Sequence, residues 1–137
     1  MEQGQLIWFE IPVLNLNRAI HFYTKVFGLK ITSTVLLDTE YGLIEKIKNS
    51  VSGVLVKKEN HIPGNGIIFF FYAISMADAL SQVMNCEGQI IKGKTLIKQK
   101  NETGDVMINN NLIDNNIGYF AEILDSEGNK LCIYSNS

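Results

Sequence analysis

The sequence predicts an α+β domain in which a strand, a helix and two or three further strands occur twice. A strand followed by a well-delimited helix occurs over residues 6–28, and the same pattern begins again at residue 66. Between these two patterns, residues 58–66 are polar and rich in glycine, which is typical of a linker. We therefore predict one domain with modules over residues 1–60 and 66–137. On periodicity alone, a single α+β sandwich without duplication fits the chain equally well.

The first module begins with a predicted strand over residues 6–13, where every side chain but one is apolar or aromatic. The exception is Glu10, which the alternation of a strand places on the same face as Trp8 and Pro12. A helix is predicted over residues 16–27, because an asparagine precedes it as N-cap and a glycine follows it. Three β-favouring runs complete the module: 29–37, 41–46 and 52–57.

The second module repeats this order. A non-alternating apolar strand is predicted over residues 66–73, and we expect it to be buried on both faces. A helix capped by Ser75 follows and ends near Cys86. The remaining elements are a strand over 89–99, an asparagine-rich loop over 100–116 with a short strand at 106–108, and a hairpin of residues 118–124 with residues 130–134.

Composition excludes several classes of protein. The 137-residue chain is 46% hydrophobic and 19% charged, which is the balance of a soluble globular domain. A net charge of −2 and a single arginine, Arg18, argue against nucleic-acid binding, since phosphates need a clustered basic surface. No apolar run approaches the roughly 20 residues of a membrane helix. Two cysteines without metal-like spacing, and no recognisable leader, lead us to expect a cytoplasmic protein.

Sequence motifs at both ends of the chain carry a further indication. They are Trp-Phe-Glu-Ile-Pro at 8–12, Phe-Tyr at 22–23, Gly-Tyr-Phe-Ala at 118–121 and Asp-Ser-Glu-Gly-Asn at 125–129. Together they resemble the vicinal oxygen chelate superfamily of glyoxalases, extradiol dioxygenases and bleomycin- or fosfomycin-resistance proteins, and look most like its small lactoylglutathione-lyase-related members. The resemblance implies two βαβββ modules forming a curled mixed sheet, or cup, with the helices outside. It also implies a homodimer, and a ligand or metal inside the cup.

Metal-binding members of the superfamily present His, Gln or Glu from the first strand of each module and Glu from the last strand of each. The resemblance places these positions on Trp8, on Ile68 to within one residue, in the strand over 52–57, and on Cys132. Residues 52–57 contain no carboxylate, and neither an indole nor an alkyl chain binds a hard cation. A single cysteine does not make a site. We therefore expect no metal centre and no cofactor.

Glu10 is the main candidate for a functional residue. By resemblance its face of the strand looks into the cup, where a carboxylate must find a partner or shift its pKa. It is therefore a candidate general base or ligand anchor, although a salt bridge at a dimer seam or a tyrosine hydroxyl would equally satisfy it. We expect Trp8, Cys132 and Tyr134 to line the same pocket, with Trp8 stacking and Tyr134 donating a hydrogen bond. Each of the three also suits a plain core position.

Several other residues are weaker candidates. The two histidines are expected to be ordinary surface residues, His21 on the polar face of the first helix and His61 in the linker. No histidine lies near Cys132 in sequence to activate it as a nucleophile. Glu122 points away from the cup if its odd-numbered neighbours in the strand share the face of Cys132. In the long loop, Gly104 and the asparagines over 109–111 suit either a lid or a plain surface loop.

Three hypotheses for function follow. The first is a metal-independent protein that binds an unidentified small molecule in an aromatic-rimmed cup and acts by sequestration or sensing. The alternative is a lyase, isomerase or dioxygenase-type enzyme that uses Glu10 as a base or as one ligand of a reduced metal site. In the third, the domain functions only through its dimer surface.

Overall fold

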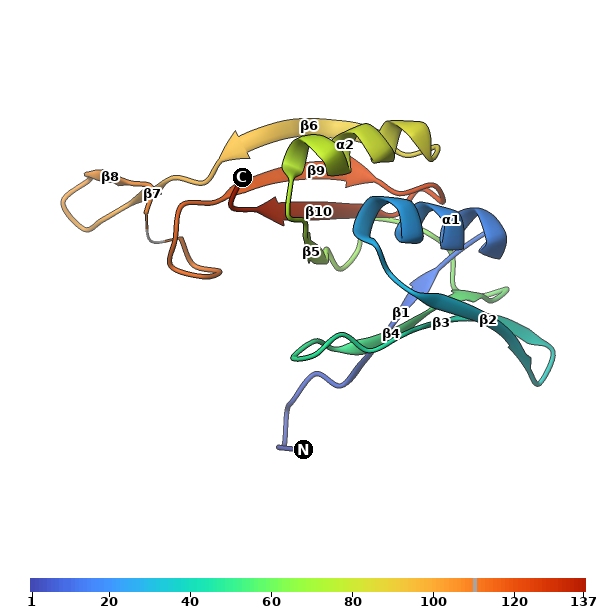
Figure 1. Cartoon of the computed structure of the whole chain (residues 1–137). Coiled ribbons are helices and arrows are strands. Elements are labelled where there is room, and N and C mark those ends of the chain that lie inside the picture. Colours follow the sequence, from blue (N-terminus) through green and yellow to red (C-terminus); the bar gives the residue numbers. More distant parts are fainter. Residues whose placement is uncertain (110) are drawn as a thin grey trace.

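The computed structural model of the chain describes residues 1–109 and 111–137, and its elements follow the predicted order (Figure 1). The first module contains β1 (Trp8–Pro12), α1 (Leu16–Phe27), β2 (Ile31–Leu36), β3 (Thr39–Ile44) and β4 (Ser52–Lys57). The second module contains β5 (Phe70–Tyr72), α2 (Met76–Asn85), β6 (Gln89–Leu96), β7 (Gln99–Lys100), β8 (Val106–Met107), β9 (Tyr119–Leu124) and β10 (Lys130–Ser135).

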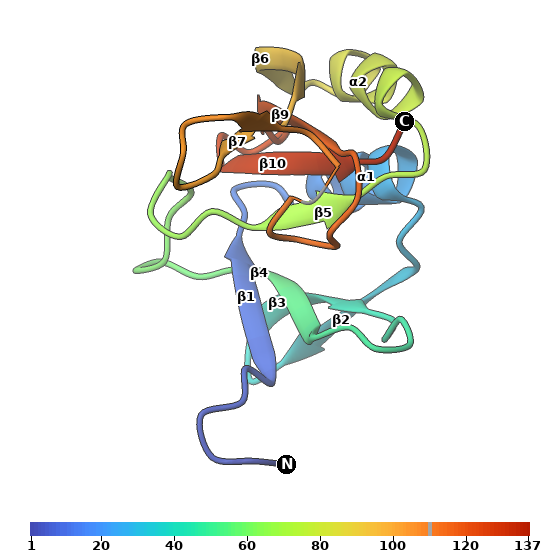
Figure 2. The ribbon, with the colours of Figure 1, turned by 90° about the vertical axis from the view of Figure 1, so that its left-hand side faces the viewer.

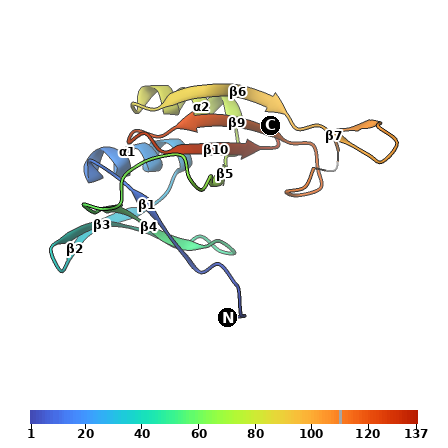
Figure 3. The ribbon, with the colours of Figure 1, turned by 180° about the vertical axis from the view of Figure 1, so that it is seen from behind.

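Each module forms one four-stranded mixed sheet. The strand order is β1-β4-β3-β2 in the first sheet and β5-β10-β9-β6 in the second. In both sheets the strand before the helix pairs in parallel with the last strand of the module, and the other pairs are antiparallel. β7 and β8 pair with each other and project from the end of the second sheet (Figures 1 and 3). The repeated topology confirms the predicted α+β fold of two βαβββ modules with curled mixed sheets.

Local sequence signals set the limits of the helices. The Asn15 side chain accepts a hydrogen bond of 2.9 Å from the backbone N–H of Arg18, as predicted for an N-cap. Gly28 ends α1 in the left-handed conformation, with φ of 69°. Ser75 caps α2 in the same way as Asn15 caps α1. Neither helix in the described part of the chain has the length and apolar character that crossing a bilayer requires.

One face of each sheet packs against the helices. α1 contacts α2 and the strands β3 and β4, while α2 packs on β6, β9 and β10 (Figure 2). Side chains such as Ile11, Leu55, Ile123 and Ile133 join the buried stripes of both helices in one core. Among residues 1–109 and 111–137, no helix covers the other side of either sheet. These sides are called the open faces below: that of the first sheet carries Trp8, Glu10 and Leu43, and that of the second carries Phe70, Tyr72, Glu122, Cys132 and Tyr134.

Strand pairing also settles or corrects three sequence-based expectations. Glu122 pairs directly with Cys132 and so shares its face, whereas Ala121 and Ile123 point into the core. The strand predicted over residues 66–73 is shorter, and the expectation that both its faces are buried is wrong. Because β5 is an edge strand with one open face, Phe70 and Tyr72 are 52% and 58% exposed.

Candidate functional site

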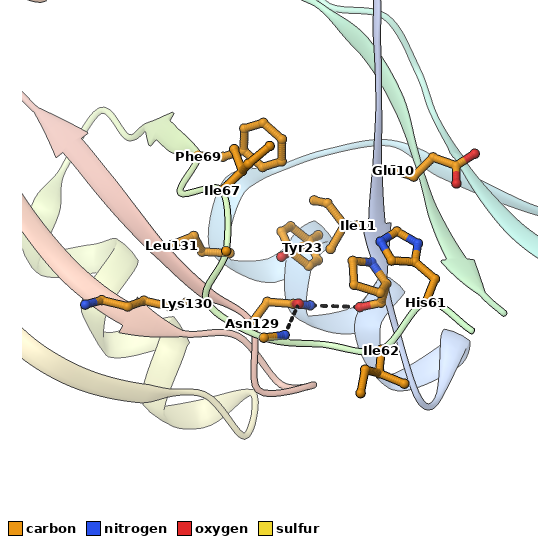
Figure 4. A pocket seen from close by; sticks show the side chains of 13 residues that line it. Glu10, Ile11, Tyr23, His61, Ile62, Ile67, Phe69, Asn129, Lys130 and Leu131 are labelled. Atoms are coloured by element: carbon orange, nitrogen blue, oxygen red, sulfur yellow. Dashed lines mark hydrogen bonds between the residues drawn. The ribbon is translucent and has the colours of Figure 1, made fainter. Parts of the chain in front are cut away.

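Two cavities lie where the modules meet, and Phe69 lines both of them. The first has a volume of about 280 Å³ (Figure 4). Its wall comes from the end of β1, from the linker and from the start of β10: Glu10, Ile11, Pro12, Tyr23, His61, Ile62, Gly64, Gly66, Ile67, Phe69, Asn129, Lys130 and Leu131. The Asn129 side chain joins these segments, because it donates to the Pro12 carbonyl at 2.8 Å and accepts from the Gly64 N–H at 3.1 Å.

Glu10 lies on this first cavity with its carboxylate in an ion pair. The Lys58 ammonium donates to it over 2.9 Å, and this hydrogen bond raises the pKa of Lys58. Both side chains are about one-third exposed, at 31% for Glu10 and 38% for Lys58. The Glu10 carboxylate is therefore paired by a salt bridge within the chain, and its partner Lys58 belongs to the linker.

His61, which the sequence predicts to be an ordinary surface residue of the linker, lines this cavity. The linker turns back on itself through a β-bridge between Lys58 and His61, which brings the imidazole beside β1 and into the same cavity as Glu10 (Figure 4). A sequence signal for this placement is that Lys58, His61 and Pro63 cluster in the segment that connects β4 to the second module. Periodicity could not show which strand the segment would touch.

The second cavity is larger, about 450 Å³, and is here called the aromatic cavity. Its lining residues come from β1, the end of α1, the β3–β4 turn and β5: Leu6, Phe9, Phe27, Leu29, Ile44, Glu45, Ile47, Ser50, Val51, Phe69, Phe70, Phe71 and Tyr72. Phe27 and Phe71 stack with ring centroids 4.7 Å apart, and Phe9 and Phe69 tilt against each other at 5.3 Å. Such pairs form a rigid apolar wall. No sequence pattern predicts this cavity.

The four predicted site residues are divided between the two open faces. Trp8 and Glu10 lie on the first sheet, and Trp8 is 48% exposed and lines neither cavity. Cys132 and Tyr134 lie together on the second sheet, and both are buried. Burial, reinforced by the charge of Glu122, raises the pKa of the Cys132 thiol. A nucleophilic cysteine needs the opposite shift, so Cys132 is not suited to that role.

Tyr134 donates a hydrogen bond as expected, but to a neighbouring loop. Its hydroxyl donates to Asp114 at 2.6 Å and accepts from the Asn111 and Asn136 amides at 2.8 and 3.1 Å. Hydrogen bonds to the Asp114 carboxylate, first from the Tyr134 hydroxyl and then from the Asn136 amide, lower the pKa of Asp114 to about 2. The loop before β9 is thereby fixed over the end of the second sheet. Asn110, within the stretch considered as a lid, lies outside the described residues.

We expect Tyr134→Phe to loosen this loop. Removing the hydroxyl deletes its hydrogen bond to the Asp114 carboxylate, at a cost of roughly 1–2 kcal/mol. Hydrogen exchange at residues 111–117 should become about ten-fold faster. Tyr72→Phe is the matched control, because that ring is mostly exposed. Unchanged exchange in Tyr134→Phe would show that other contacts hold the loop.

Comparison with known proteins gives a likeness at the level of structure. No protein-family model matches the sequence, and no curated protein matches it. The structure of a glyoxalase/bleomycin resistance protein from Albidiferax ferrireducens is similar, with a TM-score of 0.61 and 15% identity over 94% of this chain and 97% of that chain. A glyoxalase/bleomycin resistance protein/dioxygenase family enzyme from Burkholderia phytofirmans has a TM-score of 0.62 and 13% identity over 98% and 100%.

A mutant of glyoxalase I from Zea mays has a TM-score of 0.67 and 16% identity, over 96% of this chain and 46% of that chain. The agreement extends over both modules. The chain has the vicinal oxygen chelate fold. At these identities the likeness concerns the fold and not the chemistry.

The metal centre that this fold implies does not fit the side chains present. In residues 1–109 and 111–137, no three His, Cys, Asp or Glu side chains gather closely enough to hold an ion. At the expected positions, Trp8 and Ile68 carry no donor for a hard cation, and β4 has no carboxylate. In the strand pairing Cys132 lies between Phe70 and Glu122, and of these two neighbours Glu122 alone carries a group that binds a cation. No step of a reaction is therefore assigned to a metal in this vicinal oxygen chelate fold.

Proposed function

We propose that this protein binds a small apolar or aromatic molecule in the aromatic cavity without a metal, and acts by sequestration or sensing. The observation that carries the proposal is a cavity of about 450 Å³ with six aromatic side chains in its wall. Ligand pockets typically measure about 300–1,000 Å³, with apolar walls and few polar groups. At the positions where metal-binding members of the superfamily hold their ligands, Trp8 and Ile68 carry no donor for a hard cation, which supports a role without a metal.

A second candidate function is an enzyme that uses Glu10. It is favoured by one observation, that Glu10 and His61 line one cavity. The ion pair with Lys58 and the smaller volume weigh against it. Metal analysis of protein purified without chelator tests this reading. Stoichiometric zinc, nickel, manganese or iron that disappears in Glu10→Ala would favour the enzyme.

We also propose that the protein forms a homodimer. The open face of the first sheet exposes large apolar side chains, Trp8 and Leu43, which is typical of surfaces that bind a partner. Light scattering at micromolar concentration tests the proposal, and a monomer would contradict it.

Ligand binding is tested with 2-naphthalenemethanol, a neutral bicyclic probe. It should raise the melting temperature in a saturable way, since a ligand at 100 times its Kd adds about 2.7 kcal/mol of stability. Phe70→Ala removes part of the wall and should weaken binding roughly five-fold. Because Phe70 is half exposed, this variant should still fold.

Leu36→Ala is the matched control, because Leu36 is similarly exposed on β2 and does not line the aromatic cavity. It should leave the affinity unchanged. The proposal fails if naphthalenemethanol, indole and benzyl alcohol all leave the melting temperature unchanged. It also fails if Phe70→Ala and Leu36→Ala bind the probe as tightly as the unmodified protein.

A further inference from the structure

We infer that the aromatic cavity selects hydrophobic organic cations, such as aryl-alkyl ammonium compounds, over neutral and anionic molecules of the same shape. The inference rests on the proposed function and adds the charge of the ligand. Two features of the wall carry it: the concentration of aromatic rings, and a single charged side chain, that of Glu45.

Glu45 stands at the rim of the cavity, directly after β3. Its backbone N–H donates to the Lys30 carbonyl at 2.8 Å, which fixes the residue beside the end of α1. Its side chain is exposed, and in the described part of the chain its carboxylate forms no ion pair. Lys46 and Lys48 follow in the same turn, but neither lines the cavity. The charge facing a bound molecule is therefore negative.

The aromatic wall favours the same sign of charge. The face of a phenyl ring carries the negative part of its quadrupole and attracts a cation within about 6 Å of its centre. The wall combines the stacked pair Phe27 and Phe71 with the tilted pair Phe9 and Phe69. Phe70 and Tyr72 add two half-exposed rings at the mouth. An ammonium group at the mouth would meet ring faces and the Glu45 carboxylate, while its apolar part fills the interior.

Charge complementarity decides between occupants of this cavity. A second copy of the chain carries the same net charge of −2, so its net charge does not draw it to the acidic rim. An anionic ligand would place its charge beside Glu45 with no lining lysine, arginine or histidine to balance it. A small organic cation fits both the apolar interior and the acidic rim.

The experiment compares three probes that share one ring system and differ in charge: 2-naphthylmethylamine, protonated at neutral pH, 2-naphthalenemethanol, and 2-naphthoate. Calorimetric titration of the full chain should give the tightest binding for the amine. We expect a preference of roughly three- to ten-fold over the alcohol, and weaker binding still for the naphthoate. Raising the salt concentration from about 0.05 M to 0.5 M should reduce the preference, because the Glu45 charge is exposed to screening.

Glu45→Gln separates this inference from the proposed function. It should reduce the preference for the amine and leave the affinity for the alcohol unchanged. Glu102→Gln removes the same charge from a residue outside the cavity wall and should alter neither value. If the alcohol binds but the three probes bind equally, or Glu45→Gln keeps the full preference, cation selection is wrong while ligand binding stands. If no probe binds, or a second copy of the chain closes the cavity, both are wrong.

Discussion

Asp125→Ala is expected to lower the free energy of unfolding by roughly 3–5 kcal/mol, a large share of the stability of a small domain. The carboxylate is 2% exposed and accepts hydrogen bonds from the Tyr23 hydroxyl at 2.6 Å and the Asn129 amide at 2.9 Å. It also accepts from the backbone N–H groups of Glu127 and Asn129, both at 2.8 Å. Alanine would leave these donors without their acceptor in a dry environment, which costs more than the loss of the bonds alone.

Urea denaturation at neutral pH measures this effect. Asp78→Ala is the matched control, since that aspartate is exposed in the first turn of α2 and its loss should cost less than about 1 kcal/mol. Tyr23→Phe should show an intermediate loss, because the buried hydroxyl is only one of the four donors. If Asp125→Ala is no more destabilising than Asp78→Ala, water or a shifted backbone replaces the carboxylate.

Elements with local signals were predictable from the sequence. Asn15 and Gly28 mark the ends of α1 through their own side-chain and backbone preferences, and α1 has the predicted bounds. The strand predicted over residues 66–73 shows where such signals fail. Its unbroken apolar character predicts burial on both faces, whereas β5 is an edge strand whose rings line a cavity. Periodicity cannot distinguish a side chain buried in a core from one that lines an open pocket.

The partners of the candidate-site side chains were not predictable, because they come from segments that are distant in the sequence. The Asp-Ser-Glu-Gly-Asn turn was recognisable as a motif, but its partners lie more than a hundred residues away: Tyr23 is 102 positions from Asp125, and Arg18 is 109 from Glu127. For Tyr134, hydrogen-bond donation was foreseen but its acceptor, Asp114, was not. The chemistry of a side chain follows from its type, whereas the group that it meets is set by how the two modules pack.

Glu127→Ala is expected to cost roughly 2–4 kcal/mol at neutral pH, because the Glu127 carboxylate holds the start of α1 against the β9–β10 turn. Its side chain is fully buried and accepts from the backbone N–H groups of Leu14 and Asn15 at 2.8 and 2.7 Å. Arg18 adds two donors, with Nε at 2.6 Å. The variant would leave two backbone donors and a guanidinium without their shared acceptor.

The dependence of this loss on pH provides the sharper test. Burial acts to raise the pKa of Glu127, but the hydrogen bonds from Arg18, Asn15 and Leu14 outweigh it and lower the pKa below the ordinary value. A carboxylate with a lowered folded-state pKa stabilises the fold above its unfolded-state pKa of about 4.3, and loses that contribution as the pH falls through its folded-state pKa. The difference in stability between the unmodified protein and Glu127→Gln should therefore be constant above about pH 5.5 and shrink below about pH 4.

The pKa of Asp125 is shifted in the opposite direction to that of Glu127. Its contribution to the pH dependence of stability must therefore be separated from that of Glu127. Burial raises the pKa of Asp125 despite its hydrogen bonds, so its contribution grows as the pH falls, and the two trends partly cancel in the unmodified protein. Subtracting the Glu127→Gln profile isolates the Glu127 part, because Asp125 is retained in both proteins. Glu102→Gln, which removes an exposed carboxylate, should give a difference close to zero at every pH. A Glu127→Gln difference that stays constant down to pH 3 would mean that Arg18 and the start of α1 gain nothing from the charge of Glu127.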